Sequence, residues 1–213
     1  DILKKFKKKL SIGFDPELFT NSTLKKKFNT FCNLFPITEN LIDKIYKVKE
    51  SALVNPFYNL HEKISGESMS SKINRIIKMI KAKKIDNIFI SAPENVAWLL
   101  NIRGKDSPNS PIPNCKIILT NKKKIFFFSC PKKIYQLHKN KKYKHLTFCT
   151  YKNFSKIIKK LKGNSFSIDA STCSFSNENI IKSAFKIKND VDPCYIMKSI
   201  KNNSEIKNMI NTH

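Results

Sequence analysis

Hydrophobic positions between residues 66 and 192 switch repeatedly between helical and strand spacing. One helix face is marked by four isoleucines at intervals of three and four, with Ser70 or Ser71 available to cap the helix: Ile73, Ile76, Ile77 and Ile80. Further helices are expected at 94–100, 131–138, 152–162 and 177–183. Strands are expected at 87–91, 116–120, 124–129, 146–150, 165–169 and 184–188.

Strands that alternate with helices favour an α/β domain built in layers. The two apolar runs around Asn121-Lys-Lys123 predict a β-hairpin, which adds an antiparallel pair to such a sheet. We therefore predict an α/β fold in which a mixed β-sheet is flanked by helices over residues 66–192.

The flanking segments are less regular. Residues 1–50 suggest helix, strand, helix, strand, with a turn at Asp15-Pro16 and helical spacing over Leu24–Phe35. This stretch is too short to close a core of its own. Residues 51–65 lack a period, so we predict a linker there. Residues 193–213 have the spacing of one or two helices whose apolar face has no evident partner.

Charge is the most unusual property of the composition, with 41 basic and 16 acidic residues and a net charge of +25. Arg75 and Arg103 are the two arginines, whereas nucleic-acid recognition usually exploits the planar guanidinium group. Lys, Asn, Ile and Phe are abundant together, which is the bias of an AT-rich coding sequence. We interpret the charge as a solvated lysine surface, and a nucleic-acid surface or an acidic-membrane surface as less favoured alternatives.

Residue types with metal or redox chemistry are present without the spacing that such chemistry requires. The six cysteines contain no Cys-x-x-Cys pair, and the four histidines do not complete a zinc site. Several cysteines stand in apolar surroundings, where a reduced thiol acts as a small hydrophobe. We expect a reduced, cytoplasmic, soluble chain, because no apolar run approaches the roughly 20 residues of a membrane span.

Catalytic templates are also missing from the sequence. It contains no Gly-rich phosphate loop, no nucleophile turn and no His-Glu-x-x-His helix. Asp190 and Asp192 precede Pro193, where turn formation and helix capping are the preferred interpretation. We therefore predict no catalytic residue and no metal ligand in this chain.

One segment, Glu94–Gly104, gathers residues that are rare in this composition: the single tryptophan, Trp98, with Arg103 and Gly104. A structural interpretation places Trp98 in the core, ends the helix at a left-handed Gly104 and gives Arg103 a surface ion pair. A functional interpretation makes the segment the edge of a site for a peptide or a carboxylate, with an aromatic wall and a fork-shaped donor.

The same segment, ENVAWLLNIRGKDSP, resembles the Asn-x-x-Ala-Trp-Leu-Leu-Asn-Ile-Arg-Gly-x-Asp-x-Pro signature in the second domain of long-form Xaa-Pro aminopeptidases (aminopeptidase P). In two of the blocks given next, this chain differs from the family: Glu17 (block 11–20) and Tyr46 (block 36–47) stand where the family has tryptophan. Four more blocks follow the order of the family: SIGFDPELFT (11–20), PITENLIDKIYK (36–47), SGESMSSKINRI (65–76) and DPCYIMKSIKNNSEIKNMINTH (192–213).

The resemblance implies a creatinase/prolidase N-terminal-domain-like fold, with an RNase H-like motif, for residues 66–192. It also implies that residues 1–50 are the C-terminal remnant of a first domain of that type, joined by the linker 51–65. Residues 193–213 would be the linker and first helix of a catalytic domain that this chain lacks.

In that family the activity is metal-dependent hydrolysis that removes the N-terminal residue before a proline. The family holds two divalent metal ions, usually manganese, in its catalytic domain, so we expect this chain alone to bind no metal and to be inactive. The resemblance implies a metalloprotease whose partners are a peptide with proline at the second position, the catalytic domain and a second copy in a homodimer. No specific nucleic acid and no membrane are expected.

By resemblance, we expect Trp98 and Arg103, supported by Asn101 and Asp106, to border the catalytic cleft and to limit substrate access. The alternative is a stand-alone, non-enzymatic α/β binding module derived from that family.

Overall fold

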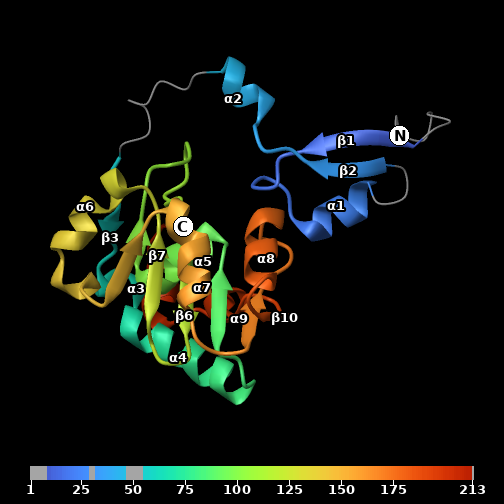
Figure 1. The fold of residues 1–213 in the computed structure, drawn as a ribbon. Coiled ribbons are helices and arrows are strands. Elements are labelled where there is room, and N and C mark those ends of the chain that lie inside the picture. The colour runs from blue at the N-terminus through green and yellow to red at the C-terminus, as the bar shows by residue number, and fades with distance from the viewer. Residues whose placement is uncertain (1–8, 29–31, 47–54, 213) are drawn as a thin grey trace.

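A six-stranded mixed β-sheet forms the centre of the molecule in the computed structural model, which describes residues 9–28, 32–46 and 55–212 (Figure 1). The strand order is β10-β9-β4-β6-β7-β8. Neighbours pair in parallel except β4 with β6 and β6 with β7. The strands are β4 (Asn87–Ile90), β6 (Lys116–Thr120), β7 (Ile125–Phe128), β8 (Leu146–Cys149), β9 (Ser165–Ile168) and β10 (Lys186–Asn189).

Helices cover both faces of this sheet, because successive strand side chains point to opposite sides. Ile88 and Ile90 join one core, and Phe89 between them joins the other. The first core is closed by α4 (Met69–Ala82), α5 (Pro93–Leu100), α6 (Pro131–Lys139) and α9 (Pro193–Ser199), and the second by α7 (Phe154–Lys160) and α8 (Phe175–Lys182). The predicted α/β fold with a mixed sheet flanked by helices is confirmed.

Helix α4 begins slightly earlier than its sequence pattern indicates. Ser68 has extended backbone angles and its hydroxyl accepts a hydrogen bond from the N–H of Ser71, so Ser68 is the N-cap. The prediction of Ser70 or Ser71 as the cap is wrong, because both residues already lie within the first turn. The Ser71 hydroxyl instead donates to the Glu67 carboxylate.

The N-terminal part forms a small layer of its own, with β1 (Leu10–Phe14), α1 (Asn21–Phe28), β2 (Cys32–Pro36) and α2 (Leu41–Ile45). Strands β1 and β2 pair in parallel, with Leu10 opposite Cys32. The expected helix over Leu24–Phe35 is therefore wrong from Cys32 onward, because pairing with β1 outweighs the local helical spacing. The helix expected at the start of the chain lies outside the described residues.

This layer lies beside α8 and away from the edge strand β8 (Figure 1). The Phe14 ring packs edge-on against the Phe175 ring, with 5.0 Å between the ring centroids. The N–H of Phe175 donates to the Phe19 carbonyl over 2.7 Å, and the N–H of Ser176 donates to the Pro16 carbonyl over 2.9 Å. The segment from Phe14 to Phe19, which includes the turn at Asp15-Pro16, thus docks on the start of α8.

The described part of the predicted linker is ordered into β3 (Tyr58–Asn59) and α3 (Glu62–Ser65). Strand β3 pairs antiparallel with β5 (Ile102–Arg103), and Phe57 is completely buried. This packing could not be predicted from hydrophobic periodicity, because elements this short contribute only one or two buried side chains. The division into 1–50, 51–65, 66–192 and 193–213 remains a prediction.

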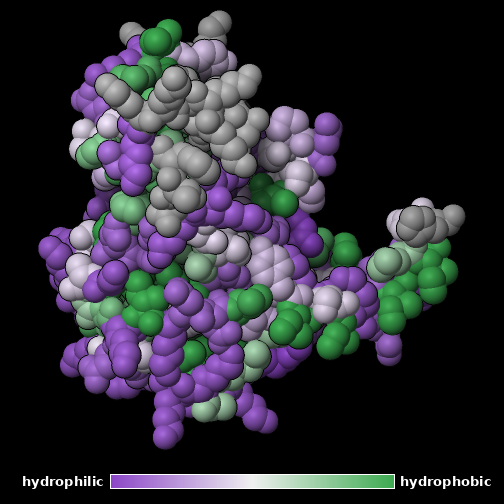
Figure 2. Space-filling view, turned by 90° about the vertical axis from the view of Figure 1, so that its right-hand side faces the viewer, coloured by the Kyte–Doolittle hydropathy of each residue, from purple (hydrophilic) through white to green (hydrophobic). Residues whose placement is uncertain are grey.

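The last helix, α10 (Asn203–Thr212), packs on α3, where the Asn202 amide donates to the Ser65 carbonyl over 2.8 Å. Ile196 on α9, Ile200 directly after α9 and Ile210 on α10 are exposed. On the face that Figure 2 shows, hydrophobic residues lie in small groups among mainly hydrophilic ones.

The described residues also include the 3₁₀ helices Lys141–Tyr143 and Tyr151–Asn153. All six cysteines are free thiols. None of the helices in the described ranges combines the length and the hydrophobicity that crossing a membrane requires.

Candidate functional site

The segment that holds the rare residues forms helix α5 and the turn that follows it. Asn101 ends α5 in the left-handed conformation (φ 53°, ψ 45°), which asparagine tolerates better than most residues. The expectation of a left-handed Gly104 is therefore wrong. Gly104 is needed for a different reason, because a Cβ atom there would lie 2.7 Å from the Cα of Pro113.

Asn101 is the hydrogen-bonding hub of this turn. Its Oδ1 accepts from Lys72 Nζ over 2.8 Å, and its Nδ2 donates to the Glu67 carbonyl over 2.8 Å. Its own carbonyl accepts from the N–H of Leu60 and from the Tyr143 hydroxyl. Both amide atoms of the side chain are thus engaged within the protein, so Asn101 holds its neighbours in place.

Lys72 is the most important residue that the sequence interpretation missed. Its side chain is 1% exposed, its Nζ donates to the Trp98 carbonyl over 2.9 Å, and it lies 4.2 Å from the centroid of the Trp98 ring. Burial lowers the pKa of Lys72 to about 8, although Glu67 and Glu205 raise it. The available signal was its position four residues before Ile76, on the apolar face of the helix.

Trp98 is partly buried and packs against the core on the α4 side of the sheet. Its Nε1 is enclosed and has no hydrogen-bond partner among the described residues. A cavity of about 280 Å³ adjoins it, lined by Lys72, Asn101 and Arg103 on one side and by residues of α10, including Glu205 and Met209, on the other.

Arg103 extends the same wall from strand β5. Its guanidinium donates to the carbonyls of Ile102, over 2.8 Å, and Ala97, over 3.3 Å. It makes no ion pair with an acidic residue in the described part of the chain, so the surface ion pair of the structural interpretation is not formed. Burial lowers the pKa of Arg103 from its ordinary value, but arginine remains protonated at neutral pH.

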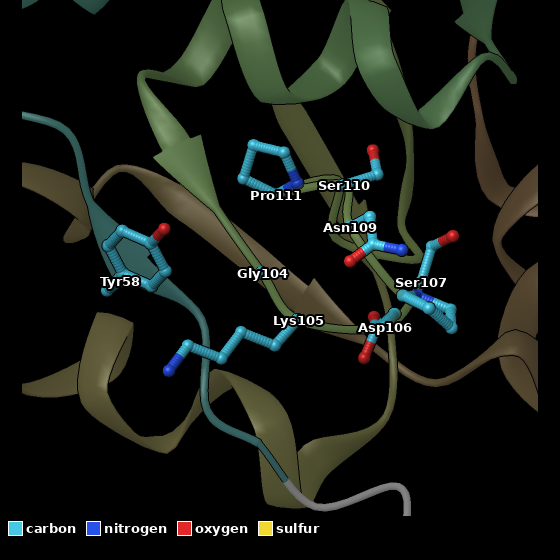
Figure 3. Close-up of a pocket in the computed structure, with 9 residues that line it drawn as sticks. Tyr58, Gly104, Lys105, Asp106, Ser107, Asn109, Ser110 and Pro111 are labelled. Atoms are coloured by element: carbon cyan, nitrogen blue, oxygen red, sulfur yellow. The ribbon is translucent and has the colours of Figure 1, made fainter.

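Asp106 lies in a neighbouring hollow of about 530 Å³, lined by Tyr58 and the loop 104–111 (Figure 3). Its carboxylate accepts from the N–H of Asn114 over 2.6 Å and pairs with Lys133, both side chains being 10% exposed. The structure therefore brings Trp98, Asn101 and Arg103 together around one cavity and places Asp106 apart from them, where it fastens the loop.

No metal-binding cluster accompanies this cavity. Within the described ranges, no group of three or more His, Cys, Asp or Glu side chains could hold a metal ion, so this part of the chain does not fit a dinuclear metal site. Asp190 pairs with Lys83, and Asp192 caps α9 by accepting from the N–H of Cys194. Asp192 thus has the capping role expected of it, whereas Asp190 forms an ion pair rather than a cap.

Comparison with known proteins locates this arrangement within a family. Residues 49–205 match the sequence profile of the Creatinase/Prolidase N-terminal domain. The chain is 27% identical over 211 residues to the Xaa-Pro aminopeptidase ApepP of Drosophila melanogaster, an alignment that covers 95% of this chain and 34% of that protein. It is 32% identical over 116 residues to a probable Xaa-Pro aminopeptidase P of Colletotrichum graminicola, covering 52% of this chain and 19% of that protein. The chain thus spans about a third or less of these relatives.

A solved structure has the same fold. The X-prolyl aminopeptidase of Caenorhabditis elegans, described as a cytosolic enzyme with a di-nuclear active site, superposes with a TM-score of 0.82 at 22% identity. The superposition covers 100% of this chain and 36% of that one. At this level of identity the likeness establishes the fold alone.

Proposed function

This chain belongs to the creatinase/prolidase N-terminal domain family, and from that premise we propose that it is the non-catalytic N-terminal part of a metal-dependent Xaa-Pro aminopeptidase. The observation that carries the proposal is the alignment of 95% of the chain with about a third of a protein named as an Xaa-Pro aminopeptidase. In this proposal the metal-dependent hydrolysis belongs to a further part of the longer protein, and so do its two divalent ions.

The role proposed for this chain is to shape access of peptides to that active site. Trp98 offers an aromatic surface beside the cavity, and Arg103 offers N–H donors on a cation that no described carboxylate neutralises. Peptide carbonyls and carboxylates are the acceptors that suit these donors. Asn101 contributes by holding the turn, and Asp106 by fixing the loop beyond Gly104. The substrate in this proposal is a peptide with proline at the second position.

The experiment is kinetic and uses the full-length enzyme that contains this chain. Arg103→Ala should lower kcat/KM for Xaa-Pro peptides by roughly 10- to 100-fold, the loss expected for one charge-assisted hydrogen bond. The variant should remain folded, with an unfolding midpoint only slightly lowered by the loss of its hydrogen bonds to the Ala97 and Ile102 carbonyls. Arg75→Ala is the matched control, because Arg75 is exposed and pairs with Glu67. Unchanged kinetics with reduced stability would show that Arg103 only packs.

A stand-alone, non-enzymatic binding module is the second candidate, favoured by the net charge of +25. The mass of the mature polypeptide in its native cell distinguishes the two. A protein about three times longer, with Asp, His and Glu metal ligands, supports the enzyme. Binding to random duplex DNA supplies a second criterion, since a solvated lysine surface predicts weak binding that salt abolishes. We propose a cytoplasmic location, because the similar nematode enzyme is described as cytosolic.

A further inference from the structure

Lys72 places a charge in the interior of the first core. It lies on the buried face of α4 between Met69 and Ile76, and its side chain is 1% exposed. An ammonium group in such surroundings is strongly unfavourable unless it finds acceptors. Lys72 has two, the Trp98 carbonyl and Asn101 Oδ1, and its third neighbour is the face of the Trp98 indole.

All three interactions go to one structural unit, the last turn of α5 with its left-handed cap. Cations stabilise the carboxyl end of a helix, where carbonyl groups lack partners and the dipole is negative. Helix α5 has no basic residue in its own last turn. Lys72 supplies that cation from α4, and at the same time fixes the backbone that carries Trp98.

The acceptors around this ammonium are electrically neutral. The Glu67 carboxylate is bound by Arg75 and Ser71, and the Glu205 carboxylate accepts from the N–H of Asn202, so neither forms a hydrogen bond with Lys72.

Glu67 before α4, Glu205 on α10, Arg103 on β5 and Cys194 on α9 are the titratable groups that act on Lys72. Burial has a larger effect than these charges and lowers the pKa of Lys72 to about 8.

We propose that Lys72 is a positioning residue for Trp98, whose hydrogen bonds and contact with the indole hold Trp98 and the Asn101 turn, and whose protonation loosens both. The neutral amine keeps hydrogen-bond donors for both acceptors, whereas the ammonium adds the cost of a buried charge, which its attraction to the indole face and to the carboxyl end of α5 only partly offsets. The orientation of the Trp98 wall then depends on pH in the mildly alkaline range. The consequence for peptide access rests on the proposed function, whereas the positioning itself does not.

The test exploits the fact that Trp98 is the single tryptophan of the 213 residues. Indole fluorescence of this chain, excited selectively, is recorded through a pH titration with circular dichroism as the check of folding. The parent should show one transition in emission with a midpoint near pH 8. Lys72→Met should lose the transition. Lys78→Met, an exposed lysine of the same helix, should keep it.

Lys72→Arg decides the outcome if Lys72→Met does not fold. Arginine keeps its charge over this range, so its emission should stay at the value of the acidic parent without a transition. A flat titration of the parent, or a transition that persists in folded Lys72→Met or in Lys72→Arg, overturns the proposal. The kinetics of Arg103→Ala test the proposed function separately, so an emission transition with unchanged kinetics rejects that function and leaves the positioning role standing.

Discussion

Asn95 on α5 donates its amide to the Asp192 carboxylate over 2.7 Å, and both side chains are buried. The same carboxylate caps α9 through the N–H of Cys194, and Lys198 of α9 donates back to Asn95 Oδ1 over 2.6 Å. Helix α9 is thus fastened to the helix that carries Trp98 by polar contacts as well as by Met197 in the core.

Removing this carboxylate should weaken the whole domain. Asp192→Ala loses a helix cap and leaves the Asn95 amide unpaired in the core, so the free energy of unfolding should fall by about 2–4 kcal/mol in urea denaturation. Asp190→Ala is the matched control, because its ion pair with Lys83 is exposed and should contribute about 0–1 kcal/mol. A double-mutant cycle with Asn95→Ala should show coupling, and strictly additive losses would contradict the link.

Much of this fold could be predicted from local patterns alone. Helix α5 and the β6-β7 hairpin follow from short-range spacing and turn residues, so their positions were predicted within one or two residues. Strand β2 was missed because its partner β1 is some twenty residues away, and pairing at that distance leaves no local periodic signal. The resemblance supplied the family, which the hydrophobic pattern could not.

The candidate site was predicted in part. Trp98 and Arg103 stood out because they are rare in this composition, and the structure places both at one cavity. Lys72 was missed because lysine is the commonest basic residue of this chain, and the sequence alone does not distinguish a buried lysine from an exposed one. Asp106 lies apart from the cavity, where its carboxylate pairs with Lys133. The two residues are 27 positions apart in the sequence, and no rule of local spacing indicates such a contact.

Gly104 should tolerate no larger side chain, although its backbone is not left-handed. In Gly104→Ala the new Cβ would meet the Pro113 Cα at 2.7 Å, so the strand or the loop must shift, and we expect a loss of about 1–3 kcal/mol. Gly13→Ala is the control, because its Cβ would meet a side-chain methyl group, Ile37 Cγ2, at 2.8 Å rather than a backbone atom, and should cost less. Thermal or urea unfolding measures both, and equal losses would argue against backbone contact as the cause.

The stability contributed by Lys72 should depend on pH in a defined direction. Its folded pKa of about 8 lies below the ordinary 10.5, so between these values the unfolded chain binds more protons than the folded one. Stability therefore rises with pH across this window, by at most about 3 kcal/mol, and is independent of this group below it.

The measurement is urea unfolding of the parent and of Lys72→Met at a series of pH values, since groups common to both cancel in the difference. The free energy of unfolding of the parent minus that of Lys72→Met should increase as the pH rises above 8. A difference that stays constant through this range would mean that Lys72 titrates alike in the folded and unfolded chains.

The Asp106–Lys133 ion pair should contribute less to the free energy of unfolding than the effect of removing one partner suggests. Both side chains are 10% exposed, so removing one leaves a largely buried charge without its partner. Asp106→Ala or Lys133→Ala alone should cost about 3–5 kcal/mol. Replacing both, as Asp106→Leu with Lys133→Met, removes the two desolvation penalties together and should cost less than either single change.

The exposed Glu67–Arg75 pair is the control, where Arg75→Ala should cost about 0–1 kcal/mol. If the double variant loses as much as the sum of the singles, the carboxylate acts through the Asn114 N–H instead, and the loop is held by that bond rather than by the ion pair.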